Sequence, residues 1–364
     1  MRTIYLTKCP KLNDRTMLKT PKVYGSNTGN FAFMYALQNT INCIPKTPEQ
    51  LLRTDNADVD NIVIHSLIWI RENTDVGAFL NKLLQRFDKP IIPISVGLQA
   101  DNSQTDFSFH PNTLRVLSEM QERAILGVRG EYTAYMLNKN GITNLRVIGC
   151  PSMYIKTNYN RKVAKKDFSE VQAVMSNYKT ISNRIDTPTD LAILDYLQEN
   201  TQVFVEQTPC YAGRAVLDNA LKDKVDFLIR KRRMFCIYEN WLRFARKHDF
   251  CIGGRFHGNV ISVLAGVPSL FIIVDSRTKE LTDFFKFPTI NREDFDPSKP
   301  LEYYYDLADY SEFNKNYPKR LDNFIRFCLD NNLELTSGTD QYFARRQSKL
   351  NKKVINLMND CSLR

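Results

Sequence analysis

An arginine and a histidine stand two positions apart in a glycine-rich segment of the second half, the part of the sequence best suited to chemistry. The letters GGRFHG place Arg255 and His257 among Gly253, Gly254 and Gly258. The guanidinium group of an arginine is a planar fork of donors that suits a phosphate or a carboxylate. An imidazole titrates near neutral pH and can therefore give or take a proton. We predict that Arg255 and His257 are catalytic and that the three glycines bring the backbone close to an anionic ligand.

The flanking residues predict that this glycine-rich turn joins a strand to a helix. An apolar run at 249–253 precedes it, and residues 257–265 have a helical pattern that Gly266 and Pro268 end. The amino end of a helix presents free N–H groups and a positive dipole end, which attract anions. A lone histidine near a helix start often only caps or packs. Here it stands with an arginine and three glycines, so we favour the functional interpretation.

The other three histidines predict less. His65 ends an apolar strand, which favours a half-buried imidazole with a satisfied hydrogen bond. His110 lies in a polar loop and His248 lies between two charged residues, so both are expected at the surface. The sequence contains no HxH or HExxH pattern, and we therefore expect no metal site.

Apolar runs alternate with helical patterns along both halves of the chain. In the first half we expect strands at 61–66, 90–97, 124–129 and 145–149, with helices at 75–87, 113–122 and 131–140. In the second half we expect strands at 171–175, 202–206, 249–253 and 269–274, with helices at 189–199, 216–246, 257–265 and 278–285. This alternation predicts βαβ units and parallel sheets. Open sheets of this kind bind ligands beyond the carboxyl ends of their strands.

The change of character after Cys150 predicts a linker over 150–168, and the tail at 311–359 is expected to be largely helical. We therefore expect an N-terminal Rossmann-like domain at 1–165, a second one at 166–310 and a helical tail at 311–364. A chain of 364 residues is long enough for two such domains.

The composition describes a basic globular protein with a formal net charge of +10. Such a balance suits acidic partners. The basic run at 230–233 is interpreted as a solvent-exposed face. The alternative interpretation is that it contacts an anionic membrane or substrate. No nucleic-acid-binding motif is present. The eight cysteines form no CxxC pair and are expected to be reduced, mostly buried thiols. No signal peptide or membrane-spanning run is evident, which predicts a cytoplasmic protein, with peripheral contact at the inner membrane face as an added suggestion.

Four segments together resemble the polysaccharide pyruvyl transferase family, and they occur in the family's order. They are YGSNTGN at 24–30, SVGLQ at 95–99, GVRGEYTA at 127–134 with VIGCP at 147–151, and the stretch from 241 through GGRFHG to AGVP at 265–268. The resemblance implies a GT-B-like α/β fold, with two Rossmann-like parallel-sheet domains that face a cleft. It also implies transfer of a pyruvyl group from phosphoenolpyruvate to two hydroxyls of a sugar, which gives a ketal.

Roles for individual residues follow from the resemblance. His257 would be the general acid that protonates the donor, while Arg255 and Arg129 would hold its anionic groups. Arg277, which follows the strand at 269–274, is a further candidate for the donor phosphate. Phosphoenolpyruvate is a co-substrate here, and no cofactor is implied. The partner would be a glycan or a lipid-linked oligosaccharide of a bacterial capsule, exopolysaccharide or cell wall.

Three residues are candidates for binding the acceptor sugar: Asn27 and Asn30 in the first domain, and Glu206 in the second. Asn27 and Asn30 would either hydrogen-bond the acceptor or only shape a turn, and the sequence leaves both open. Glu206 ends a strand and is either a base that activates a sugar hydroxyl or a surface carboxylate. Two alternatives to the whole assignment also remain: a GT-B-type glycosyltransferase with a nucleotide-sugar donor, and a non-catalytic glycan-binding protein of the same pathway.

Overall fold

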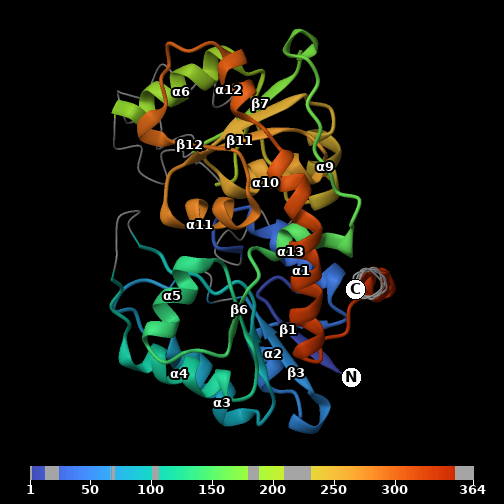
Figure 1. The fold of residues 1–364 in the computed structure, drawn as a ribbon. Coiled ribbons are helices and arrows are strands. Elements are labelled where there is room, and N and C mark those ends of the chain that lie inside the picture. The colour runs from blue at the N-terminus through green and yellow to red at the C-terminus, as the bar shows by residue number, and fades with distance from the viewer. Residues whose placement is uncertain are drawn as a thin grey trace, which may run out of the picture.

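Two parallel β-sheets, one in each half of the chain, organise the computed structural model (Figure 1). The structure describes residues 2–12, 24–65, 67, 70–100, 106–178, 188–208 and 231–348. Figure 1 shows the first sheet below the second, with the long helix α13 (Ser311–Asp330) running alongside both. The predicted α/β fold with two Rossmann-like parallel sheets is therefore confirmed.

The first sheet has the strand order β2-β1-β3-β4 and is continued by the pair β5-β6. Its strands are β1 (Thr3–Leu6), β2 (Ile44–Lys46), β3 (Asn61–Ile64), β4 (Ile91–Pro93), β5 (Leu126–Val128) and β6 (Leu145–Val147). A parallel bridge between Val96 and Val128 joins the two parts. The helices are α1 (Asn30–Thr40), α2 (Pro48–Leu52), α3 (Gly77–Arg86), α4 (Pro111–Gln121) and α5 (Glu131–Lys139), with a short 3-10 turn η3 (Asn56–Asp58). Strands such as β3 are buried along their whole length, as apolar strands covered on both faces must be.

The second sheet has the order β12-β11-β10-β7-β8-β9, and every pair is parallel. Its strands are β7 (Val174–Asn177), β8 (Val203–Val205), β9 (Arg232–Arg233), β10 (Phe250–Gly253), β11 (Ser269–Ile273) and β12 (Thr289–Asn291). The helices are α6 (Pro188–Asn200), α9 (Tyr238–Ala245), α10 (Phe256–Leu264), α11 (Ser276–Phe285) and α12 (Leu301–Leu307), with the turns η5 (Phe168–Glu170) and η8 (Arg292–Asp294). From β7 the chain builds outward to β8 and β9, and from β10 it builds outward the other way. The strands β7 and β10 therefore flank the topological switch point, where open α/β sheets bind ligands.

The helix expected at 216–246 is only partly present. Residues 209–230 lie outside the described residues, the pair Arg232–Arg233 is an edge strand, and helix begins only at Tyr238. The helical prediction is wrong at 231–237, because Arg232 pairs with Phe204 of β8 and extends the sheet. Long-range pairing of this kind overrides local helical preference.

The segment expected to be a linker does connect the two sheets, but much of it is buried. Its 3-10 turn η4 (Pro151–Thr157) packs against α1, and the Tyr154 hydroxyl donates to the Ile148 carbonyl at 2.6 Å. The helix α1 is buried on nearly all sides, since it also meets the second half, where Tyr35 stacks on Tyr238 at 4.3 Å. This helix, which belongs to the first half in sequence, is thus part of the junction between the halves.

The tail returns to the first half after α13. The Tyr317 hydroxyl on α13 donates to the Met153 carbonyl, and Asn331 exchanges two hydrogen bonds with the backbone of Ile125. A bridge between Ile41 and Leu335 follows. Helix is confirmed over 311–330, whereas the turn at 331–338 interrupts it. The domain boundaries at 165 and 310 stay a prediction. No helix within the described ranges combines the length and apolar character needed to cross a bilayer.

Candidate functional site

The switch point of the second sheet is held together by two buried asparagines. Asn177 ends β7, and its Oδ1 accepts from the Arg255 backbone N–H at 2.8 Å. Its Nδ2 donates to Asn259 Oδ1 at 2.9 Å, and Asn259 Nδ2 in turn donates to the Gly253 carbonyl at 2.6 Å. Both asparagines are fully buried, where satisfied polar networks fix a single conformation. The glycine-rich turn between β10 and α10 is therefore rigid before any ligand arrives.

The glycines of this turn are needed because other residues of the protein pack closely against them. A Cβ at Gly258 would lie 2.6 Å from Asn177 Cγ, and one at Gly253 would lie 1.9 Å from the Asn177 carbonyl oxygen. The room beside Gly254 is taken in the same way by the ring of Tyr178. The space left by the missing side chains is thus filled by protein atoms. Direct contact of these three residues with a donor stays a prediction, and it would involve their backbone.

The amino end of α10 is open. The N–H groups of Phe256, His257 and Gly258 have no hydrogen-bond partner within the described part of the chain, and no side chain caps the helix. Unpaired N–H groups at a helix start bind anions well, because the helix dipole adds to their own partial charges.

Three neighbouring helix starts are filled, in contrast. The Asn27 side chain accepts from the Gly29 N–H before α1, the Glu280 carboxylate accepts from the Thr133 N–H of α5, and Asp275 caps α11. Among these four starts, and for the described residues, only α10 has none of its first three N–H groups hydrogen-bonded. We infer that the fold reserves this position for an anion.

His257 lies half-buried between residues of both halves. Its ring is 5.7 Å from that of Phe33 on α1, and its Nε2 is 3.6 Å from the Cys150 sulfur at the start of η4. Burial, followed by the positive charge of Arg277, lowers the pKa of His257 to about 3. The imidazole is therefore neutral at physiological pH in the free protein. The ring is at the junction of the two halves, as a catalytic role requires.

Three arginines are linked electrostatically near this position through Arg277, which also acts on His257. Arg255 donates from Nε to the Tyr178 carbonyl at 3.2 Å and from a terminal nitrogen to Thr208 Oγ1 at 2.8 Å. Arg277 pairs with Asp275 at 2.8 Å, and its Nε is buried without a partner in the described residues. Burial lowers the pKa of Arg129 to about 10, and the charge of Arg277 adds to this effect. Arg277 is thus within electrostatic reach of both Arg129 and Arg255.

The acceptor candidates are placed less favourably. Asn27 shapes the turn before α1, and Asn30 Nδ2 donates to the Tyr24 carbonyl at 2.9 Å. Turn chemistry therefore accounts for both side chains. Glu206 is 2 % exposed, and its Oε1 accepts from the N–H groups of Gln207 and Thr208. The expectation of a surface carboxylate is wrong, because the loop after β8 folds back on this side chain. Acceptor binding by these residues stays a prediction.

Sequence reasoning missed several residues of this junction. Cys150 was taken only as a buried thiol, whereas its sulfur contacts His257. No role was predicted for Gln207, and Glu280 was not singled out at all. The position of Gln207 directly after a strand of a parallel sheet was a usable signal. Nothing in the local sequence marks Glu280, which lies inside α11 and reaches a helix of the other half.

Two half-buried histidines should make the protein less stable in mild acid. A hydrogen bond of 2.7 Å joins His65 Nδ1 and the Tyr5 hydroxyl, as expected of a strand-end histidine with a satisfied hydrogen bond. Burial lowers the pKa of His65 to about 4. The pKa of His257 is lowered to about 3. Both imidazoles take up a proton near pH 6.5 only in the unfolded chain, so the unfolded state binds more protons below that pH. We expect the free energy of unfolding to fall as the pH decreases from about 6.5 to 4.

Urea unfolding at pH 7.5, 6.0 and 5.0 measures this effect. The double variant His65→Gln and His257→Gln should show a flatter pH dependence than the wild type. An unchanged slope in the double variant would refute the assignment of these two groups.

Glu280 should contribute to the stability of the junction. The side chain is 8 % exposed and accepts from the Thr133 N–H at 2.7 Å and from Thr133 Oγ1 at 3.0 Å. A Cβ at Gly130 would lie 2.2 Å from Glu280 Cγ, so a glycine is needed there. Glu280→Gln keeps one oxygen for the Thr133 N–H, but it removes the negative charge and places an amide NH₂ group where Thr133 Oγ1 donates. We expect it to lower the free energy of unfolding by about 1–3 kcal/mol.

Chemical denaturation measures this change, with Glu119→Gln as the control. Glu119 is an exposed partner of Arg115 on α4, and its replacement should cost about 0.5 kcal/mol or less. Equal effects of the two substitutions would contradict the role of Glu280.

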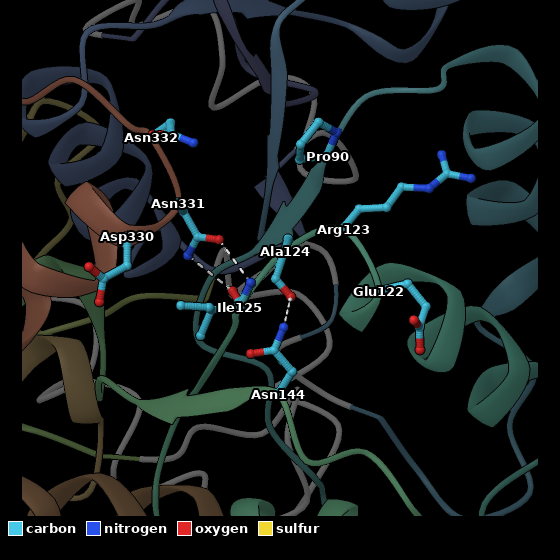
Figure 2. A pocket seen from close by; sticks show the side chains of 9 residues that line it. All are labelled: Pro90, Glu122, Arg123, Ala124, Ile125, Asn144, Asp330, Asn331 and Asn332. Carbon is cyan, nitrogen blue, oxygen red and sulfur yellow. Dashed lines mark hydrogen bonds between the residues drawn. The ribbon is translucent and has the colours of Figure 1, made fainter.

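A pocket at the opposite edge of the first sheet is structural. Figure 2 shows it between the amino ends of the strands and the end of α13. The side chain of Asn331 donates to and accepts from the Ile125 backbone, and Asn144 Nδ2 donates to the Ala124 carbonyl at 3.1 Å. These polar groups fasten the tail to the sheet and are remote from the switch point.

A protein-family model matches most of the chain. The family model described as polysaccharide pyruvyl transferase matches residues 27–276. This span includes the GGRFHG turn, Arg129 and the loop before α1. None of the curated proteins matches the chain significantly.

Solved structures with a similar arrangement share little sequence with the chain. A co-structure of MnaA from S. aureus with UDP is 12% identical, with a TM-score of 0.47 and coverage of 91% of this chain and 98% of that one. The structure of HepE from Anabaena with UDP and glucose is 10% identical, with a TM-score of 0.47 and coverage of 97% and 100%. The UDP-GlcNAc 2-epimerase from Methanocaldococcus jannaschii is 12% identical, with a TM-score of 0.46 and coverage of 90% and 99%. A likeness at this level assigns neither a substrate nor a mechanism to the chain.

Proposed function

The chain belongs to the polysaccharide pyruvyl transferase family, and from this premise we propose that it moves a pyruvyl group from phosphoenolpyruvate onto two hydroxyls of a sugar. The acceptor would be a bacterial surface polysaccharide or its lipid-linked precursor. The observation that carries the proposal is the open amino end of α10, which has His257 in its first turn and Arg255 at its cap. A small donor with two anionic groups suits a site built in this way.

The guanidinium groups supply the charge that the donor needs. Phosphoenolpyruvate carries a phosphate and a carboxylate. Arg277 interacts electrostatically with His257, and also with Arg129 and Arg255. Arg277 retains a buried Nε without a partner among the described residues, which leaves a donor for an incoming oxygen. Fixed guanidinium groups at such a site also stabilise the phosphate as it leaves.

The reaction needs one proton at the methylene carbon of the donor. Protonation of that carbon makes the neighbouring carbon electrophilic, and a sugar hydroxyl attacks it. The bond from this carbon to the phosphate oxygen then breaks, and the second hydroxyl attacks the same carbon to close the ketal. Of the two hydroxyl protons released, one replaces the proton used at the methylene carbon and the other leaves with inorganic phosphate. We assign the donation of the first proton to His257.

Because the pKa of His257 is low in the free protein, the imidazole can act as an acid only after the donor has bound. The imidazole is neutral in the free protein, because its pKa is about 3. An anion bound at the first turn of α10 favours the charged form and raises that pKa. The donor would therefore bring its own acid into the active protonation state.

Release of inorganic phosphate tests the proposal. The protein would be incubated with phosphoenolpyruvate and a panel of galactose- and mannosamine-containing oligosaccharides and lipid-linked precursors. Phosphate release that depends on an acceptor, with a mass gain that matches a pyruvyl ketal, is the expected result. No turnover across the panel would count against the proposal.

A thermal-shift comparison separates this donor from a nucleotide sugar. A ligand that binds the folded state raises the unfolding temperature. We expect a shift with phosphoenolpyruvate and none with UDP-sugars, and the reverse would favour a glycosyltransferase. Unchanged acceptor binding in His257→Ala, together with an inactive wild type, would favour a glycan-binding protein.

The net charge of +10 favours a cytoplasmic site of action beside an anionic membrane that carries a lipid-linked acceptor. Binding to vesicles with and without anionic lipid measures this directly. Equal binding to both kinds of vesicle would contradict it.

A further inference from the structure

A buried amide beside the open helix start lacks a hydrogen-bond partner. Gln207 follows β8 and is 1 % exposed, and its Nε2 has no partner within the described residues. The rest of this residue is firmly held: its N–H donates to Glu206 Oε1 at 2.9 Å, and its carbonyl accepts from the Thr28 N–H at 2.7 Å. The side chain itself is enclosed by the surrounding protein, since it is almost fully buried. An unsatisfied buried group is costly, and in a native protein it calls for an explanation.

The amide lies between the starts of α1 and α10. A Cβ at Gly258 would be 2.8 Å from Gln207 Nε2, which places this nitrogen beside the first turn of α10. A Cβ at Gly29 would be 2.2 Å from Gln207 Oε1 and 3.0 Å from His257 Cβ. Gln207 and His257 thus approach the same point from two elements.

A second unpaired group comes from the other half of the chain. Thr28 is fully buried, and its Oγ1 has no partner in the described part of the chain. Together with the free N–H groups of α10, the junction holds several donors and too few acceptors. Such a set is completed by oxygen atoms of an anion.

We propose that Gln207 and Thr28, with the first turn of α10, form a subsite for a carboxylate. These donors are neutral, and they fit the single charge of a carboxylate, whereas the guanidinium groups of Arg255 and Arg277 match the higher charge of a phosphate. The identity of the ligand as the carboxylate of phosphoenolpyruvate rests on the proposed function. Gln207 is then a positioning residue that orients the donor beside His257.

Binding measurements with partial ligands test this subsite. Isothermal titration would be carried out with phosphoenolpyruvate, with pyruvate as a carboxylate without phosphate, and with inorganic phosphate. We expect Gln207→Leu, which keeps a side chain of comparable volume and removes its donors, to weaken pyruvate and phosphoenolpyruvate binding by roughly 10- to 100-fold. Phosphate binding should stay within about two-fold of the wild type. Thr28→Val should act in the same direction with a smaller effect.

Two controls separate binding from folding. Gln198→Leu, on α6, replaces another glutamine with a buried unpaired amide atom at a place remote from α10, and it should leave all three affinities unchanged. The unfolding temperature of ligand-free Gln207→Leu should equal or exceed that of the wild type, since a costly unpaired group is removed. A purely structural role for Gln207 would lower this temperature.

The outcomes are distinct. Unchanged pyruvate and phosphoenolpyruvate binding in Gln207→Leu would overturn the subsite and leave the proposed function standing. Loss of phosphate binding with pyruvate unaffected would place the amide at the phosphate and would overturn the carboxylate assignment. A wild type that binds none of the carboxylate ligands would overturn the proposed function and the subsite with it.

Discussion

Replacing His257 with asparagine is expected to lower the rate of acceptor-dependent phosphate release by about 10²–10⁴-fold. The substitution removes the group that we assign to proton donation at the methylene carbon. It keeps a polar side chain of similar reach, and the half-buried position of the ring makes the change compatible with folding. Because donor binding depends on the arginines and the open helix start, the affinity for phosphoenolpyruvate should change much less than the rate.

His65→Asn is the matched control. His65 is also half-buried with a lowered pKa. It directly follows β3 in the first sheet, and its Nδ1 is hydrogen-bonded to the Tyr5 hydroxyl. Its replacement should leave the rate within a few-fold of the wild type. Equal rate losses in the two variants, or full activity of His257→Asn, would contradict the assignment of the acid.

Proton uptake gives an independent measure of the same assignment. Phosphoenolpyruvate binding to the wild type near pH 6 should take up protons, because the bound anion raises the pKa of His257 from its low starting value. Titration calorimetry in buffers of different ionisation enthalpy detects this uptake. The His257→Asn variant should bind without it.

Loss of the Arg255 guanidinium is expected to have the second largest effect. Truncating one partner of a desolvated charged hydrogen bond costs about 2–5 kcal/mol, which corresponds to roughly 30- to several-thousand-fold in kcat/KM for the donor. The guanidinium is fixed by the Tyr178 carbonyl and by Thr208 Oγ1, so it is already oriented for an anion in the free protein. Arg255→Lys should recover only part of the loss, because an ammonium group has no planar fork.

Steady-state kinetics with varied phosphoenolpyruvate measures this effect, and Arg233→Ala provides the control. Arg233 is an exposed arginine of β9 whose guanidinium donates to the neighbouring Arg232 carbonyl. Its loss should not change kcat/KM by more than about two-fold. Full activity of Arg255→Lys would show that a point charge is sufficient and that the fork geometry is irrelevant.

The sequence alone was sufficient for the local architecture around His257. The apolar run at 249–253, the glycine-rich turn and the stop at Gly266 and Pro268 predicted a strand, a turn and a helix, and β10 and α10 occur there. Such features depend on residues close together in the chain, whose periodicity and turn chemistry act locally. The alternation of strands and helices in each half predicted parallel sheets for the same reason.

The state of the helix starts was decided only in three dimensions. The cap of α5 is the carboxylate of Glu280, 147 positions away from Thr133, and no local pattern announces it. The free donors of α10 are visible only once every neighbouring side chain has been placed and none of the described ones reaches them.

The glycines and the loop residues also depend on contacts that the local sequence does not predict. The turn needed glycine at 258 because Asn177 and Gln207, 81 and 51 positions earlier in the chain, pack against it. A surface position was one of two alternatives for Glu206, yet the side chain is buried and accepts from the N–H groups of the next two residues. The sequence by itself determined which segments form elements and which carry a titratable or cationic group, because these are properties of neighbours along the chain. Only the tertiary structure decided which donors remain unpaired, because pairing depends on segments that folding alone brings together.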